Sequence, residues 1–151
     1  MSAVIEGHHD DHHHGPAKGI TRWLFTTNHK DIGSLYLWFS FIMLFIGGAM
    51  AMVIRAELFE PGSQIVSPEF YNQMVTNHGL IMVFGVIMPA FVGFANWLVP
   101  MQIGAPDMAL PGLNNLSFWI LPAAFGVLIS TFFMEGGAPN FGWTFYAPLS
   151  T

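Results

Sequence analysis

Three long uncharged stretches dominate the pattern of hydrophobic and polar positions along the chain. They run from about residue 32 to 54, from 79 to 99 and from 116 to 134. A helix of about 20 apolar residues crosses the roughly 30 Å hydrocarbon core of a bilayer. The pattern therefore predicts an all-α membrane protein, a polytopic helix bundle with three transmembrane helices at these positions.

The segments between the stretches are rich in residues that form turns. Residues 55–78 contain Pro61-Gly62 and Ser67-Pro68, and residues 100–115 contain Gly104-Ala105-Pro106 and Pro111-Gly112. Such clusters of proline and glycine indicate loops. We expect loops at 55–78 and 100–115, a terminal segment at 1–31 and another at 135–151.

The distribution of charge predicts the orientation. Of the four basic residues, Lys18, Arg22 and Lys30 lie shortly before the first predicted helix. By the positive-inside rule, residues 1–31 should lie in the cytoplasm. Residues 55–78 and 135–151 should then lie outside, and residues 100–115 should lie in the cytoplasm.

Composition excludes several classes of function. Only 9% of the 151 residues are charged, whereas soluble domains carry about 25%. No basic residue follows Arg55, which excludes nucleic-acid binding. The chain has no cysteine, so it has no disulfide, no thiolate metal site and no covalently attached c-type haem.

His78 is the first candidate for chemistry, because it stands where the second predicted helix begins. Neutral imidazole is a common ligand of haem iron. The alternative is a histidine at the membrane interface that hydrogen-bonds a carbonyl, and the local sequence does not separate the two. Asn96 follows eighteen residues later, about five turns, so both should share one helix face roughly 27 Å apart.

Asp107 is the only acidic residue in the 100–115 segment. It is either a solvated turn aspartate or the mouth of a proton path, in which Asn96, Asn114 and Asn115 would hold the waters. The alternative for the paired asparagines is a cap on the third helix.

Four other residues could contribute to binding. Arg55 either reaches the lipid headgroups or hydrogen-bonds a cofactor. Glu57 and Gly62 could give calcium two oxygen ligands, but calcium usually takes six to eight. Trp143 is either an aromatic anchor at the interface or a donor to a carboxylate.

A histidine-rich stretch lies near the N-terminus. It has the sequence His8-His9-Asp10-Asp11-His12-His13-His14. We interpret it as a flexible polar tail or a tag rather than a specific metal site.

A series of motifs resembles the catalytic subunit I of cytochrome c oxidase, in the haem-copper oxidase family. The resemblance covers about residue 22 to the end and rests on motifs that occur in order: Trp23-Leu24-Phe25-Thr26-Thr27-Asn28-His29-Lys30-Asp31-Ile32-Gly33, Ile54-Arg55-Ala56-Glu57-Leu58, Thr76-Asn77-His78-Gly79, Asn96-Trp97-Leu98-Val99-Pro100, Ile103-Gly104-Ala105-Pro106-Asp107-Met108-Ala109, Asn114-Asn115-Leu116-Ser117-Phe118-Trp119 and Gly142-Trp143-Thr144.

The resemblance implies roles for the candidate residues at the outer end. His78 would be an axial ligand of the low-spin haem, haem a, and Arg55 would hydrogen-bond its formyl group. Trp143 would contact a propionate of the second haem, haem a3. Glu57 and Gly62 fall where the family has a calcium or sodium site completed by residues elsewhere.

The resemblance also implies a role for the cytoplasmic end. Asp107 would be the entrance of a proton-uptake channel, with Asn96 and Asn114 in its lower part. Protons taken up there would serve oxygen reduction and pumping.

The family's subunit has an expected twelve helices, so we expect this chain to be a fragment. Haem a3 and copper would be bound mainly by the missing part. The implied partners are oxidase subunits II and III, cytochrome c, oxygen and the lipid bilayer, and the implied location is the bacterial plasma membrane. A quinol oxidase of the same superfamily and a non-enzymatic three-helix membrane protein remain as alternatives.

Overall fold

The computed structural model describes residues 19–151, and this part of the chain is all α-helical with no strand. The predicted histidine tail lies outside the described residues. The helical elements are α1 (Ile20–Leu24), α2 (His29–Glu57), α3 (Pro68–Leu80), the π-helix η1 (Ile81–Ile87), α4 (Met88–Ile103), α5 (Pro111–Ser130) and the short 3-10 helix η2 (Thr131–Phe133). Three continuous runs are long and apolar enough to cross a membrane: His29–Glu57, Pro68–Ile103 and Pro111–Phe133. The predicted all-α class with three such helices is confirmed.

The helices extend beyond the uncharged stretches, because capping residues determine where they begin. The Asn28 side chain accepts a hydrogen bond from the Lys30 amide at 2.8 Å and starts α2. Ser67 accepts one from the Phe70 amide at 3.3 Å and starts α3. The Ser67-Pro68 pair therefore begins a helix, since proline is well suited to a first helical position. The loop between α2 and α3 is correspondingly shorter than the 55–78 segment.

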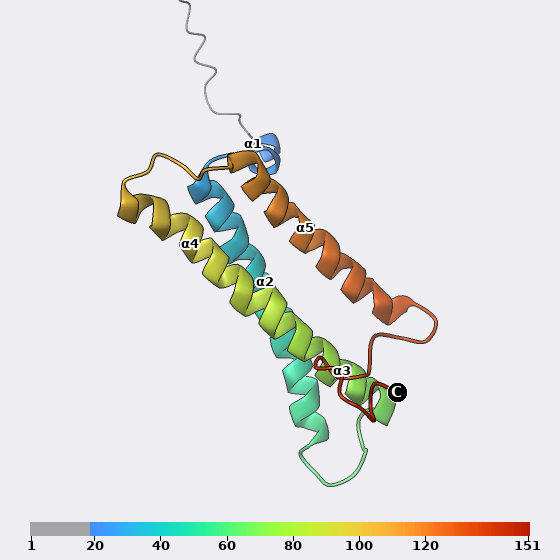
Figure 1. Cartoon of the computed structure of the whole chain (residues 1–151). Coiled ribbons are helices and arrows are strands. Elements are labelled where there is room, and N and C mark those ends of the chain that lie inside the picture. Colours follow the sequence, from blue (N-terminus) through green and yellow to red (C-terminus); the bar gives the residue numbers. More distant parts are fainter. Residues whose placement is uncertain (1–18) are drawn as a thin grey trace, which may run out of the picture.

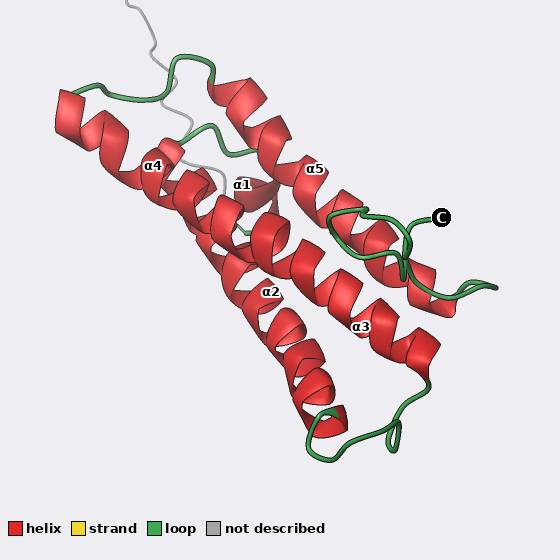
Figure 2. Cartoon of the chain, turned by 60° about the horizontal axis from the view of Figure 1, so that its bottom comes forward, coloured by secondary structure: helices red, strands yellow, loops and turns green. Residues whose placement is uncertain are grey.

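The helices form an elongated bundle (Figure 1). The α3–η1–α4 run packs along α2, and α5 also contacts α2 and η1. The same bundle turned by 60° shows the segment after α5 folding back beside α3 (Figure 2). A buried cluster joins α2, η1 and α5 and consists of Ile32, Tyr36, Phe39, Met43, Ile81, Phe118 and Phe125.

Two glycines allow α2 and α4 to approach each other closely. A Cβ atom added to Gly33 would lie 2.6 Å from Cδ1 of Trp97 and 2.9 Å from the carbonyl oxygen of Gly93. A Cβ atom added to Gly93 would lie 3.0 Å from the carbonyl oxygen of Gly33. The two backbones are therefore in direct contact, as small residues permit between membrane helices.

Substituting Gly33 by alanine should destabilise the bundle. The added methyl would overlap the backbone of α4, and overpacking of this kind typically costs about 1–3 kcal/mol. Gly48→Ala is the matched control, because the same helix leaves open space at that position. Thermal unfolding of the intact protein in detergent, followed by helical circular dichroism, should show a lower midpoint for Gly33→Ala alone. Equal midpoints for the two variants would contradict the close contact.

Candidate functional site

The candidate residues lie at opposite ends of the bundle (Figure 1). His78 lies in the last turn of α3, and its neighbours Thr76 and Asn77 bond the segment that follows η2. Asp107 lies in the loop between α4 and α5, near the start of α2. The structure therefore brings the candidates together as two separate sites.

The His78 ring is fixed by a backbone carbonyl of α2. Its Nδ1 atom lies 2.9 Å from the carbonyl oxygen of Gly47. A carbonyl oxygen only accepts, so Nδ1 carries the hydrogen, and in the neutral imidazole Nε2 then has a free lone pair. This bond to a carbonyl is the one that the interfacial alternative predicts, and it is also the arrangement of a metal-ligating histidine, whose other nitrogen usually donates to a carbonyl or carboxylate. The donor set therefore fits the iron of a haem.

Side chains of η1 pack closely against Gly47 of α2. A Cβ atom at this position would lie 2.8 Å from Sδ of Met82 and 3.2 Å from Cγ2 of Ile81. A side chain at Gly47 would require the side chains of Met82 and Ile81 to move. The missing side chain therefore leaves room for these two side chains of η1 beside the residue that accepts from His78.

Trp143 lies against the residue that follows His78. A Cβ atom on Gly79 would lie 2.7 Å from Cδ1 of Trp143. The Trp143 side chain is 45% exposed, and among the described residues its indole N–H has no hydrogen-bond acceptor. The indole donor is therefore available to another group at the same end of the bundle as His78.

Arg55 is also at this end of α2, eight residues after Gly47, which corresponds to about 12 Å along the helix axis. Its side chain is exposed. Within residues 19–151, no carboxylate lies within ion-pair distance of its guanidinium. The guanidinium is therefore available to a group outside the described residues.

The Glu57 carboxylate closes the loop between α2 and α3. Oε1 accepts from the Gln64 amide at 2.8 Å, and Oε2 accepts from the amides of Ile65 at 2.8 Å and Val66 at 3.0 Å. Glu57 is only 5% exposed. Gly62 has a φ angle of 103° and lines the same cavity of about 210 Å³. In the described part of the chain, no group of three or more histidine or carboxylate side chains could hold a metal ion.

Asp107 lies at the N-terminus of α2. Its Oδ1 atom accepts from the amides of His29 at 3.2 Å and Met108 at 2.7 Å. His29 is the first residue of α2, so the carboxylate faces unpaired amides and the positive end of the helix dipole. Oδ2 has no hydrogen-bond partner within the described chain, and Asp107 is partly exposed. One oxygen fixes the position of the side chain while the other stays free.

A chain of polar groups continues from Asp107 into the bundle. His29 Nδ1 donates to the carbonyl oxygen of Asn96 at 2.8 Å. Asn114 Nδ2 donates to Oδ1 of Asn96 at 2.6 Å, and Asn96 itself is 2% exposed. The structure therefore brings together the predicted residues Asp107, Asn96 and Asn114.

His29 is a site residue that the sequence did not reveal. It is 5% exposed and bridges Asp107 and Asn96 through its amide and its ring. Its position beside Asp107 depends on tertiary contacts between residues 78 positions apart. The only local signal was its place directly after the capping residue Asn28.

The predicted alternative role for the paired asparagines is wrong. The N-cap of α5 is Leu110, without a side-chain hydrogen bond. Asn114 instead bonds Asn96, and Asn115 Nδ2 donates to the carbonyl oxygen of Leu24 at 2.9 Å. Helix α5 already begins at Pro111, so both asparagines lie inside its first turns.

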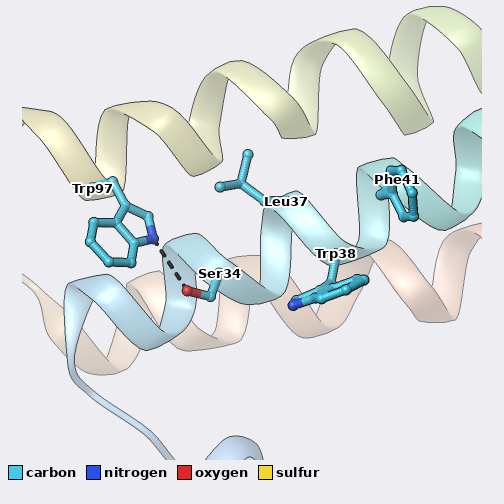
Figure 3. Close-up of a pocket in the computed structure, with 5 residues that line it drawn as sticks. All are labelled: Ser34, Leu37, Trp38, Phe41 and Trp97. Atoms are coloured by element: carbon cyan, nitrogen blue, oxygen red, sulfur yellow. Dashed lines mark hydrogen bonds between the residues drawn. The ribbon is translucent and has the colours of Figure 1, made fainter.

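An apolar groove of about 380 Å³ lies along α2, where Trp97 of α4 contacts it. Its lining residues are Ser34, Leu37, Trp38, Phe41 and Trp97, and Trp97 Nε1 donates to Ser34 Oγ at 3.2 Å (Figure 3). The groove contains none of the candidate residues. It is therefore not part of either site.

Comparison with known proteins decides the family. The model of the family described as "Cytochrome C and Quinol oxidase polypeptide I" matches residues 31–151. The chain belongs to this family. The resemblance predicted from the motifs is confirmed, and an unrelated three-helix membrane protein is excluded.

Three relatives illustrate the match of this oxidase polypeptide. A probable cytochrome c oxidase subunit 1-alpha of Streptomyces avermitilis is 50% identical over 137 residues, which cover 89% of this chain and 23% of that protein. Cytochrome c oxidase subunit 1 of Corynebacterium diphtheriae is 47% identical, with 90% and 24% covered. A heme-copper oxidase subunit I+III of Aeropyrum pernix is 48% identical, with 87% and 16% covered. The chain spans about a quarter or less of the length of these relatives.

Proposed function

We propose that this chain is the first part of the catalytic subunit of a terminal respiratory oxidase, which oxidises cytochrome c, reduces oxygen to water and pumps protons. The observation that carries the proposal is the His78 ring, which is fixed through Nδ1 and leaves Nε2 free. When bound there, a low-spin haem a would accept and pass on electrons. His78 would hold the haem iron through its free Nε2 atom, while Nδ1 stays bonded to the Gly47 carbonyl.

The neighbours of His78 would position the two haems. Arg55 is exposed near the same end of α2 and would donate hydrogen bonds to the formyl group of haem a. Trp143 would donate its free indole N–H to a propionate of haem a3. Haem a3 and copper would be held mainly by the rest of the subunit.

Asp107 would take up protons from the cytoplasm at the opposite end. Its free Oδ2 can bind and release a proton while Oδ1 remains hydrogen-bonded to the start of α2. Asn96 and Asn114 would orient the waters that carry protons inward. This arrangement requires the N-terminal end in the cytoplasm, as the basic residues before α2 predict. The family resemblance implies that the membrane is the bacterial plasma membrane.

The proposal includes a calcium or sodium site at Glu57 and Gly62. An ionised carboxylate has about four lone-pair positions, and three backbone amides already occupy three of them in Glu57. One position remains for a cation. The other ligands would have to come from outside this chain.

The electron donor distinguishes the two oxidase classes within the family. Relatives named cytochrome c oxidase favour cytochrome c, whereas the family description also includes quinol oxidases. The test is oxygen consumption by the purified intact oxidase, together with subunits II and III, supplied with reduced cytochrome c or with a quinol. Consumption with cytochrome c alone supports the proposal. Consumption with quinol alone overturns it in favour of the alternative.

A further inference from the structure

We propose that Thr76 and Asn77 are positioning residues that clamp the segment after α5 onto α3 and thereby set the place of Trp143 relative to His78. The roles of the haems in this inference rest on the proposed function. The clamp itself is a set of contacts within this chain. It joins Thr76 and Asn77, the two residues before His78, to residues 137–143.

Thr76 forms the first half of the clamp. It is fully buried, and its Oγ1 atom donates to the carbonyl oxygen of Asn72 at 2.7 Å and accepts from the Gly142 amide at 3.0 Å. The hydroxyl uses its donor within α3, so its lone pair is directed to the other segment. This bond reaches the residue directly before Trp143.

Asn77 forms the second half. Its Nδ2 atom donates to the carbonyl oxygens of Gln73 at 2.8 Å and Pro139 at 3.3 Å. Both neighbours only accept, so the orientation of the amide is determined by its partners. Asn77 is fully buried, and its Oδ1 atom has no partner within the described residues. A buried amide of this kind is expected to hold a specific position rather than to fill space.

Glycines allow the clamped segment to lie flat on α3. Gly142 has a φ angle of 76°, and Gly137 has a φ angle of 73° and packs against the side chain of Gln73. Residues other than glycine rarely adopt positive φ angles of this kind. At Gly79, the missing Cβ atom leaves the space that the Trp143 ring occupies. Residues 76, 77 and 79 therefore all hold the segment, and His78 lies between them.

The arrangement has a consequence for the two haems. His78 is fixed to α2 through Gly47 and, through its neighbours in α3, to the backbone that carries Trp143. If His78 binds one haem and Trp143 contacts the propionate of the other, the clamp makes their relative position a property of this chain. Loosening the clamp should move the Trp143 indole without removing the His78 ligand.

The test uses the intact oxidase with Thr76→Val, which keeps the shape of the side chain but removes the hydroxyl. Loss of one net hydrogen bond of about 1 kcal/mol should speed amide exchange at Gly142 about five-fold. The midpoint potential of haem a3 should shift, while the low-spin spectrum of haem a stays normal. Thr76→Ser retains the hydroxyl and should restore both values.

Thr131→Val is the matched control. Thr131 Oγ1 also donates within its own helical segment, to the Leu128 carbonyl at 2.6 Å, but accepts nothing from another segment. This variant should leave exchange at Gly142 and the haem potentials unchanged. If Thr76→Val does not assemble, Gly79→Ala provides the test, because its methyl displaces the Trp143 ring. Gly126→Ala, with open space around it, is the control for that variant.

Unchanged exchange at Gly142 in Thr76→Val would overturn the clamp. Faster exchange with an unchanged potential of haem a3 would overturn the positioning role of Thr76. Failure of the proposed function gives a different result. The wild-type protein would then show no low-spin haem, while the Gly142 amide would still exchange faster in Thr76→Val than in Thr76→Ser.

Discussion

Replacing His78 by alanine is expected to abolish the low-spin haem signal of the intact oxidase. The substitution removes Nε2, the only nitrogen that the proposal offers to haem a from this chain. The other described histidine, His29, lies at the opposite end of the bundle and uses its ring to bond Asn96. Reduced-minus-oxidised absorption spectra of the purified enzyme measure the effect, and the low-spin band should be lost completely.

His29→Gln is the matched control for this experiment. It removes the imidazole at the start of α2, but it should leave the low-spin band at wild-type intensity. A band that survives in His78→Ala would mean that another residue supplies the ligand. A band that disappears in both variants would indicate a general loss of assembly.

Replacing Asp107 by asparagine is expected to slow proton uptake on the order of 100-fold, the scale of a positioned acid-base group. The amide keeps an oxygen that can accept from the amides of His29 and Met108, but it cannot bind and release a proton in the working range. The haem spectra should therefore remain normal. Stopped-flow measurement of proton uptake, with a pH indicator dye and the reduced enzyme mixed with oxygen, measures the rate.

Asp31→Asn is the control for Asp107→Asn, because Asp31 is a carboxylate at the same end of the bundle. It forms an ion pair with Arg22 at 2.9 Å, and its hydrogen bonds and charge raise the pKa of the Arg22 guanidinium. Both oxygens of Asp31 already accept hydrogen bonds from Arg22, and neither contacts Asn96 or Asn114, so uptake should stay near the wild-type rate. Wild-type uptake in Asp107→Asn would remove Asp107 from the proton path.

The spanning helices could be predicted because hydrocarbon imposes a minimum length of uncharged residues. Their ends could not, because helix continues into polar sequence wherever a cap or a first-turn proline permits it. In α3, Glu69 and Gln73 lie in helical turns ahead of the apolar stretch. Hydropathy alone assigns such turns to a loop. The Ser67 cap was visible in the sequence, but the adjacent proline was interpreted as a turn signal.

The candidate residues could be predicted from their chemistry and from family resemblance, but their partners could not. His78 bonds a carbonyl 31 residues earlier, and Thr76 bonds an amide 66 residues later. These contacts depend on how α2, α3 and the segment after α5 pack together. Glycines indicate some of these contacts, since side chains of other elements pack closely against Gly47 and Gly79.

Chemical rescue of His78→Gly tests the central claim most directly. The variant removes the imidazole and leaves space beside Gly79, so free imidazole can enter the intact oxidase and replace the missing ligand. The account predicts no low-spin haem band in His78→Gly alone and recovery of that band when imidazole is added. A low-spin band that persists at wild-type intensity without imidazole would contradict it.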